Sequence, residues 1–402
     1  MIRELSLHEI CGRTNPDPNT ETTGVTTMLV GLPKEIKNHE YRVGLTPISV
    51  RELVANGHTV LVQSTAGEGI GESDDAYVQA GATIAGSAEQ VFKEAEMIIK
   101  VKEPQPDECR MLQSGQVLFT YLHLAPDPRQ TDLLLESDAI AIAYETVIDE
   151  NGGLPLLAPM SEVAGRMSIQ AGAMCLEKSR GGSGKLLAGV PGVAPAKILV
   201  IGGGVVGTNA IQMAVGMQAD VTVLDRSIKR LRELDAQFGG SISTVYSSQA
   251  ALEKHVATSD LIIGAVLIPG AAAPKLVSRD MLKTMQKGSV LVDVAIDQGG
   301  CFETSKATTH EEPTYIVDDI VHYCVANMPG AVASTSAHAL NHATLPFTLA
   351  LANLGYREAL IANPHLLEGL NVHRGILTNG PAAQALGKDF TDPATVLKAQ
   401  AA

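Results

Sequence analysis

The sequence of 402 residues contains no tryptophan, and aromatic residues make up only 3% of it. The core must therefore be mainly aliphatic, and aromatic platforms for stacking single-stranded nucleic acid are not expected. A basic excess is also missing, because 30 Lys and Arg residues stand against 44 Asp and Glu residues and the net charge is −14. This balance argues against a general nucleic-acid-binding protein. It still permits a small anionic substrate, which needs only local positive charge.

Paired cysteines and long apolar runs are missing as well. The five cysteines are an odd number and none has C-x-x-C spacing, so neither a disulfide framework nor a structural zinc site is expected. Free thiols in a reducing compartment are the simpler interpretation. The sequence has no run of about 18 apolar residues and no apolar signal-peptide region. We therefore expect a cytoplasmic protein without a membrane partner and without a metal site.

Residues 1–27 differ from the rest of the chain. The stretch from Gly12 to Gly24 is polar and rich in turn-forming residues, and it has neither helical nor strand periodicity. A strand-like run begins at Met28. We expect residues 1–27 to be a disordered N-terminal extension, which makes Met28 a candidate natural start.

Beyond this extension, short β-rich runs alternate with helical windows, which is typical of α/β proteins with parallel sheets. A glycine-rich loop at 180–192 separates two such sets. The tail 329–402 is expected to be largely helical, without a sheet of its own, and to pack on the first set. The predicted strands are 28–32, 59–63, 97–101, 117–121, 139–144, 197–201, 220–224, 261–264 and 289–293, and the predicted helices are 47–56, 74–80, 88–94, 161–178, 336–353, 356–362 and 382–386.

The strongest single motif is Gly202-x-Gly204-x-x-Gly207, between a predicted strand and a helical window. In dinucleotide-binding folds the first glycine permits a tight turn, the second lets the pyrophosphate approach the backbone, and the third lets helix and strand pack closely. The helix N-terminus also offers N–H groups and a positive dipole end to the phosphates. Such turns are common on their own, but the strand and helix around this one favour a cofactor site over a purely structural turn.

Asp225 ends the next predicted strand, 23 positions after Gly202. A carboxylate at this point can accept both ribose hydroxyls and repels a 2′-phosphate, which favours NAD over NADP. Arg226, Lys229 and Arg230 follow it and could weaken that exclusion.

Four charged or titratable residues follow predicted strands, where ligands bind in open parallel sheets. Lys102, His123 and Asp297 come at or just after strand ends, and Arg42 lies in the loop after the first strand. Each has an ordinary explanation by itself, as a solvated charge, a structural histidine or a turn former. Together they suit a small carboxylate, with Arg and Lys as the cations, His to move protons and Asp to hold water.

Several strings, in the same order along the chain, resemble those of bacterial alanine dehydrogenases. The run from Gly31 to Pro47 is similar to the family's N-terminal signature, and 197–225 is similar to its second signature. The runs 266–277, 292–300 and 322–332 match as well. The resemblance covers about residues 28–390, and it includes the alpha subunits of transhydrogenases as relatives.

The resemblance implies a reversible reaction in which L-alanine, NAD⁺ and water give pyruvate, ammonium and NADH. It implies that Arg42 and Lys102 bind the substrate, that His123 is the acid/base, and that Asp297 positions or activates water. Family members are typically homohexamers. Together with the glycine motif, it gives the cofactor-binding set Ser161, Gly202, Gly204, Val206, Gly207, Asp225, Arg230, Ser247, Val266, Leu267, Asn327 and Met328.

The expected architecture is α/β, with two Rossmann-like domains, parallel sheets and a cleft between the domains. The substrate domain is expected to be discontinuous, over residues 28–157 and 332–402, with the NAD-binding domain over residues 158–331. Three other functions remain open: the NAD-binding part of a proton-translocating transhydrogenase, a saccharopine-type dehydrogenase, and a catalytically silent NAD-binding protein. A transhydrogenase should lack the set Lys102, His123 and Asp297, and a saccharopine-type enzyme would need room for a far larger substrate.

Overall fold

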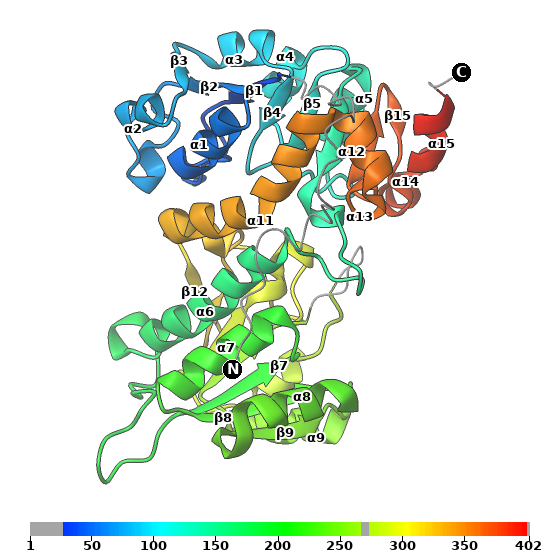
Figure 1. The fold of residues 1–402 in the computed structure, drawn as a ribbon. Coiled ribbons are helices and arrows are strands. Elements are labelled where there is room, and N and C mark those ends of the chain that lie inside the picture. Colours follow the sequence, from blue (N-terminus) through cyan, green and yellow to red (C-terminus); the bar gives the residue numbers. More distant parts are fainter. Residues whose placement is uncertain (1–26, 267–272, 400–402) are drawn as a thin grey trace.

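The computed structural model describes residues 27–266 and 273–399. Except for its last residue, the expected N-terminal extension lies outside the described residues, and so does Leu267. The described chain forms two mostly parallel sheets flanked by helices, which confirms the predicted α/β class (Figure 1).

The first sheet has eight strands in the order β15-β14-β6-β5-β4-β1-β2-β3. All neighbours are parallel, except that β14 is antiparallel to both β6 and β15. Met97 and Ile99 belong to one apolar cluster and Ile98 to another, so both faces of the sheet are covered. The strands are β1 (Leu29–Leu32), β2 (Thr59–Gln63), β3 (Thr83–Ala85), β4 (Met97–Ile99), β5 (Val117–Thr120), β6 (Ile140–Ala143), β14 (Leu370–His373) and β15 (Ile376–Leu377).

Helices around the first sheet begin at residues that cap them. The side chains of Thr46, Ser73, Ser87 and Asp127 accept N–H groups from the first turns of the helices they precede. These and the later helices are α1 (Pro47–Ala55), α2 (Asp74–Gln79), α3 (Ala88–Glu94), α4 (Pro106–Met111), α5 (Pro128–Glu136), α12 (Tyr356–Ala362), α13 (Pro364–Leu367), α14 (Gly380–Leu386) and α15 (Pro393–Ala399).

The tail contains strands that the sequence did not indicate. β14 and β15 join the edge of the first sheet beside β6, so the tail has no sheet of its own and packs on the first set, as expected, but it contributes two strands to that sheet. The reason is local: in β14, Asn371 and His373 are buried together with the apolar residues. Asn371 compensates by donating from Nδ2 to Thr146 Oγ1 at 2.7 Å. A strand with buried polar groups lacks the apolar pattern by which strands are recognised.

The second sheet has seven strands in the order β12-β13-β11-β10-β7-β8-β9, and only β12 is antiparallel to its neighbour. Strand order reverses between β7 and β10, and ligands bind at such reversals. The strands are β7 (Lys197–Ile201), β8 (Asp220–Asp225), β9 (Ile242–Tyr246), β10 (Leu261–Gly264), β11 (Val290–Asp293), β12 (Thr314–Val317) and β13 (Ile320–Tyr323), and the helices are α7 (Val205–Gly216), α8 (Ile228–Phe238), α9 (Gln249–Thr258) and α10 (Arg279–Leu282).

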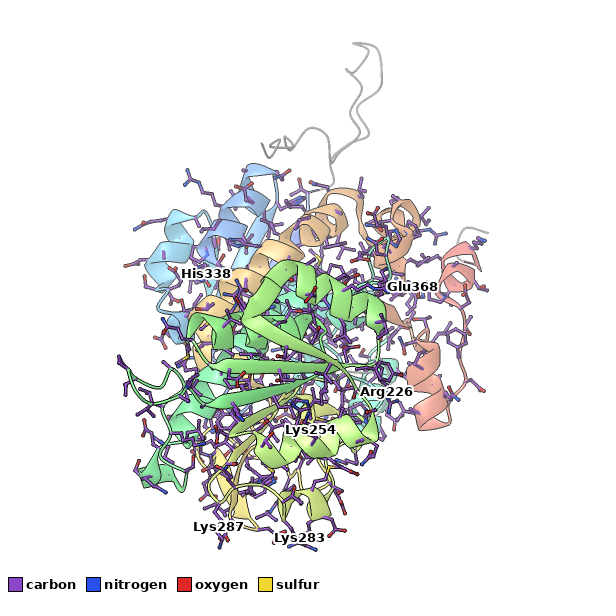
Figure 2. All side chains as sticks on the ribbon, turned by 90° about the horizontal axis from the view of Figure 1, so that it is seen from below. Arg226, Lys254, Lys283, Lys287, His338 and Glu368 are labelled. Atoms are coloured by element: carbon purple, nitrogen blue, oxygen red, sulfur yellow. The ribbon has the colours of Figure 1, made fainter. Side chains whose placement is uncertain are left out.

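Two long helices carry the chain between the sheets. α6 (Ala158–Cys175) leads into the second sheet and α11 (Ala333–Leu354) leads back, and the two helices contact each other. Figure 1 shows α11 between the half that holds β1–β5 and the half that holds β7–β9. Charged side chains such as Lys254, Lys283 and Lys287 lie on the outside of the second half (Figure 2).

Candidate active site

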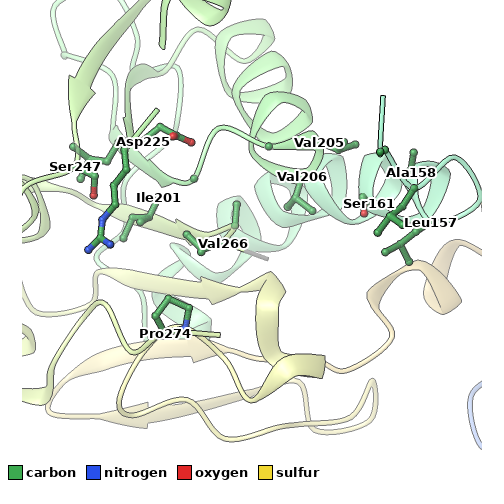
Figure 3. Close-up of a pocket in the computed structure, with 18 of the residues that line it drawn as sticks. Leu157, Ala158, Ser161, Ile201, Val205, Val206, Asp225, Ser247, Val266 and Pro274 are labelled. Carbon is green, nitrogen blue, oxygen red and sulfur yellow. The ribbon is translucent and has the colours of Figure 1, made fainter. Parts of the chain in front are cut away.

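A cleft of about 660 Å³ lies at the reversal of strand order in the second sheet (Figure 3). Its walls come from the carboxyl ends of β7, β8 and β10 and from the segment 149–161, which leads into α6. Seven of the predicted cofactor-binding residues line it: Ser161, Gly202, Gly204, Val206, Asp225, Ser247 and Val266.

Each glycine of the motif meets a different constraint. Gly202 has a φ of +100°, and a Cβ there would lie 2.7 Å from the carbonyl oxygen of Ala265. At Gly207 a Cβ would lie 1.9 Å from the carbonyl oxygen of Gly202, so only glycine lets α7 pack this closely. At Gly204 a Cβ would meet nothing within 4 Å. Since Gly204 caps α7 and lines the cleft, that open space is where a phosphate group would fit.

Asp225 is fixed by the backbone around it. Its two carboxylate oxygens accept the N–H groups of Gly203 and Ser227, each at 2.7 Å. A carboxylate has about four acceptor sites. The Asp225 carboxylate can therefore still accept hydrogen bonds from hydroxyl groups of a ligand in the cleft.

Arg230 is not among the lining residues, whereas Arg226 is. The Arg230 guanidinium is tied down: Nε donates to the carbonyl oxygen of Gly203 and Nη2 donates to Thr208 Oγ1, both at 2.6 Å. Arg230 therefore supports the glycine loop from outside the cleft. Gly207, Asn327 and Met328 also lie outside the lining.

Arg42 lies buried beside Glu40. Its Nε and Nη2 atoms donate to the two carboxylate oxygens of Glu40, at 2.7 and 2.5 Å. Nη2 also donates to Asn327 Oδ1 at 2.8 Å, and Nη1 lies 3.0 Å from the Met160 sulfur. Although burial acts in the opposite direction, the hydrogen bonds and charge of Arg42 lower the pKa of Glu40 to about 2. One edge of the guanidinium is thus occupied, and Nη1 retains N–H capacity for a ligand.

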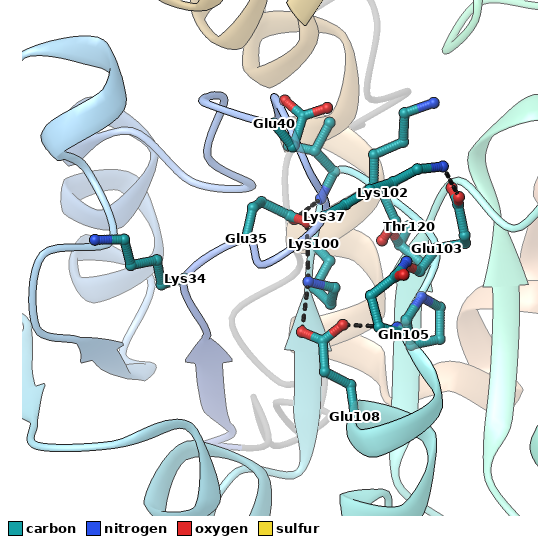
Figure 4. A network of polar contacts seen from close by, with 12 residues as sticks. Lys34, Glu35, Lys37, Glu40, Lys100, Lys102, Glu103, Gln105, Glu108 and Thr120 are labelled. Carbon is teal, nitrogen blue, oxygen red and sulfur yellow. Dashed lines mark hydrogen bonds and ion pairs between the residues drawn. The ribbon is translucent and has the colours of Figure 1, made fainter. Parts of the chain in front are cut away.

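Lys102 is half-buried just beyond β4. Burial lowers the pKa of its ammonium group, Arg42 lowers it further, and Glu103 and Asp297 oppose the shift. These effects place Arg42 and Asp297 near Lys102, although the three residues belong to different segments. Thr120 Oγ1 donates to the Lys102 carbonyl oxygen at 3.0 Å and holds the backbone. Glu103 is paired with Lys37, which leaves the Lys102 ammonium without a close carboxylate among the described contacts (Figure 4).

Asp297 does not end a strand. β11 stops at Asp293, and Asp297 lies in the following turn of 3₁₀ helix, Val294–Gln298, where it is exposed. Asp293 is buried instead and accepts the N–H group of Cys301 at 2.9 Å, a structural contact.

His123 lies beyond the end of β5, with its side chain 44% exposed. Its ring is stacked on Tyr121, with the ring planes 4° apart and the centroids 5.8 Å apart. Tyr121 Oη donates to the carbonyl oxygen of Leu156 at 2.5 Å. The chain neighbours of Leu156, Pro155 and Leu157, both line the cleft. The cleft lining itself does not include His123, Arg42, Lys102 or Asp297.

Several buried charged residues of this region were not anticipated from the sequence. They are Glu40 and the group Glu35, Lys100 and Glu108, in which Lys100 Nζ donates to Glu35 at 3.0 Å and to Glu108 at 2.8 Å (Figure 4). Charged residues are rarely buried unless paired, and sequence alone does not reveal the pairing. The one available signal was that Glu35 and Glu40 lie in the same loop segment as Arg42.

Among the described residues, no group of three or more His, Cys, Asp or Glu side chains is arranged to hold a metal ion. Within the same residues, no helix is long and apolar enough to cross a membrane.

Comparison with known proteins gives matches over almost the whole chain. Residues 31–164 match the family description "Alanine dehydrogenase/PNT, N-terminal domain" and residues 168–380 match "Alanine dehydrogenase/PNT, C-terminal domain". The chain is 60% identical to the alanine dehydrogenase of Halomonas elongata over 370 residues, which are 92% of this chain and 100% of that protein. It is 53% identical to the alanine dehydrogenase of Mycobacterium tuberculosis, with the same coverage of both chains.

Solved structures agree with these matches. A structure titled L-alanine dehydrogenase superposes with a TM-score of 0.87 at 51% identity, covering 90% of this chain and 99% of that one. A transhydrogenase from Sinorhizobium meliloti follows with a TM-score of 0.75 at 25% identity, covering 88% and 99%.

Proposed function

The chain belongs to the alanine dehydrogenase/PNT family, and from this premise we propose that it is an alanine dehydrogenase. The reaction is the reversible, NAD-dependent oxidative deamination of L-alanine to pyruvate and ammonium. One observation carries the proposal: buried Arg42 of the first half donates to Asn327 of the second half at 2.8 Å, and the charges of Arg42 and Asp297 both act on the pKa of the Lys102 ammonium group. A small carboxylate substrate suits this arrangement, because Arg42 and Lys102 can bind its carboxylate while Asp297 faces the neighbouring carbon that reacts.

The same cluster favours this activity over that of a transhydrogenase subunit. A domain that only passes hydride between dinucleotides has no small substrate to hold, whereas Lys102, His123 and Asp297 are all present here. The higher identity to alanine dehydrogenases, 60% against 25% for the transhydrogenase structure, points the same way.

The proposed site residues have separate roles in the reaction. Arg42, through Nη1, and Lys102 bind the substrate carboxylate and the side of the reacting carbon that becomes the carbonyl. When Cα loses hydride, it becomes the carbon of an iminium. Asp297 positions the water that adds to this carbon. His123 takes a proton from the water and returns it to the amino group, after which the C–N bond breaks and ammonium leaves. The bound nicotinamide supplies the hydride acceptor.

We propose NAD as the cofactor, because Asp225 lines the cleft at the end of β8. Its carboxylate can accept ribose hydroxyls and would repel a 2′-phosphate. Arg226 lines the same cleft, so the preference should be finite. The initial rate with NADP⁺ is expected to be at least about tenfold lower than with NAD⁺, which corresponds to about 1.4 kcal/mol. Equal rates with both would show that this role of Asp225 is wrong.

Membership of the alanine dehydrogenase/PNT family supports further proposals. We propose a homohexamer in the cytoplasm, with a substrate domain over 28–157 and 332–402 and a NAD-binding domain over 158–331. The pairing of β14 with β6 supports the discontinuous substrate domain, because it brings residues 370–373 to the first sheet.

The test of the function is a substrate screen with the purified protein. With NAD⁺ at alkaline pH, L-alanine should generate NADH absorbance, and glycine, serine and lysine should give much slower rates. A rate with L-alanine no higher than with the other three amino acids would contradict the proposal.

A further inference from the structure

Glu145 lies next to the candidate acid/base residue His123. β5 and β6 are parallel neighbours in which Thr120 pairs with Ala143, so the residues just beyond them meet at one edge of the sheet. His123 follows β5, and Glu145 lies in the short 3₁₀ helix Tyr144–Thr146 after β6. The Glu145 side chain is only 13% exposed.

The Glu145 carboxylate binds the backbone that carries His123. The N–H of His123 donates to Oε1 at 2.6 Å, and the N–H of Leu122 donates to Oε1 and Oε2 at 3.1 and 3.2 Å. His123 itself has a φ of +50°, a left-handed conformation that side chains other than glycine seldom adopt. Such a conformation persists only where the surrounding structure holds it, and it clusters at functional sites.

The same carboxylate faces the imidazole. Glu145 Oε1 lies 3.7 Å from His123 Nδ1, longer than a hydrogen bond, but catalytic hydrogen bonds are often long before ligands bind. A carboxylate at Nδ1 favours the proton on that nitrogen and leaves Nε2 for the reacting groups. Tyr121, whose ring is stacked on the imidazole, limits rotation on the other side.

We propose that Glu145 is a positioning residue, which holds the backbone of His123 in its left-handed conformation and sets the orientation and tautomer of the imidazole. The inference rests on the proposed function, because it assumes that His123 exchanges protons with the substrate. Glu145 acts only through His123.

The proposal predicts a split between kinetic constants. In Glu145→Gln the shape is kept, but the amide has one acceptor oxygen where the carboxylate has two. We expect kcat to fall roughly 10- to 100-fold, which is part of the roughly 10²- to 10⁴-fold that general acid–base catalysis contributes, while the KM for NADH stays within about twofold. Glu145→Asp, which keeps the charge, should retain more of kcat than the glutamine variant. If packing were the only role, the isosteric glutamine variant would be the milder of the two.

A double-mutant cycle separates positioning from general damage. In a His123→Ala background, adding Glu145→Gln should change kcat by less than about threefold, because the effect of Glu145 has already been lost. Equal fold-losses with and without His123 would overturn the proposal. Glu136→Gln, the same change at an exposed position at the end of α5, is the matched control and should keep the wild-type kcat.

The outcomes also separate this inference from the proposed function. A wild-type protein inactive with pyruvate, ammonium and NADH would contradict the function. An active wild type whose Glu145→Gln variant keeps full kcat would overturn the inference alone. If Glu145→Gln does not fold, Glu145→Asp decides by the same cycle with His123→Ala.

Discussion

At the residue scale, the candidate site depends on carboxylates that do not touch the substrate. Glu40 occupies one edge of the Arg42 guanidinium, so only the remaining N–H groups can meet a ligand. Arg42 and Lys102 could be proposed from the sequence, because each follows a strand. The contacts of Glu40 and Glu145 could not, because an acidic residue in a loop looks like any solvated charge until its tertiary contacts are known.

The geometry at Arg42 predicts that lysine cannot replace it. Lysine keeps the charge but lacks the planar fork that engages Glu40 and still leaves an N–H group of Nη1 for a ligand. We expect Arg42→Lys to raise the KM for pyruvate at least about tenfold, because one charge-assisted hydrogen bond to the substrate is lost. The KM for NADH should be nearly unchanged. Steady-state kinetics in the direction of amination would show this. An unchanged KM for pyruvate would remove Arg42 from the substrate site.

Glu40 also predicts how stability depends on pH. Its pKa falls from 4.5 to about 2 in the folded protein, so its contribution is present above the unfolded-state pKa and is lost as the pH falls toward 2. The shift corresponds to about 3 kcal/mol. Denaturant unfolding at about pH 6 and at about pH 3 should therefore show a larger loss for the wild type than for Glu40→Gln. Parallel losses in the two proteins would refute this assignment.

At the scale of elements, sequence patterns were reliable where a strand has at least three consecutive buried apolar residues. The run 261–264 is β10, and 59–63 is β2, with the same ends. Strands with mixed exposure or buried polar residues were missed, among them β9, which is partly exposed along its length, and β14. These strands form because a neighbouring strand offers hydrogen bonds, and a local pattern does not contain that information.

The glycine loop predicts that one alanine substitution lowers the stability of the fold and that another weakens the binding of NADH. Gly207→Ala places a methyl group against the Gly202 carbonyl oxygen, so it should destabilise the fold by roughly 1–3 kcal/mol. Gly204→Ala meets no protein atom, so the melting temperature should hardly change while the Kd for NADH rises about tenfold or more. Thermal unfolding and NADH titration of both variants check this. Wild-type affinity for NADH in Gly204→Ala would mean that the pyrophosphate does not approach this loop.

At the scale of the whole molecule, the proposed substrate site takes residues from both halves of the chain. Arg42 and Lys102 come from the first half, whereas Asn327 and Asp297 come from the second, and Arg42 is bonded directly to Asn327 across the junction. Composition argued against a general nucleic-acid-binding protein and left room for an anion site. It could not place the site, because spacing along the chain does not show which strand ends meet in space.

The most direct test of the central claim follows the hydrogen on the substrate Cα. L-alanine deuterated at Cα is incubated with NAD⁺ and the protein, and the products are analysed by mass spectrometry. If the protein transfers this hydrogen to NAD⁺ as hydride, one pyruvate is formed for each NADH, with the deuterium in the nicotinamide ring. Pyruvate formed without deuterium in NADH, or no pyruvate at all, would contradict it.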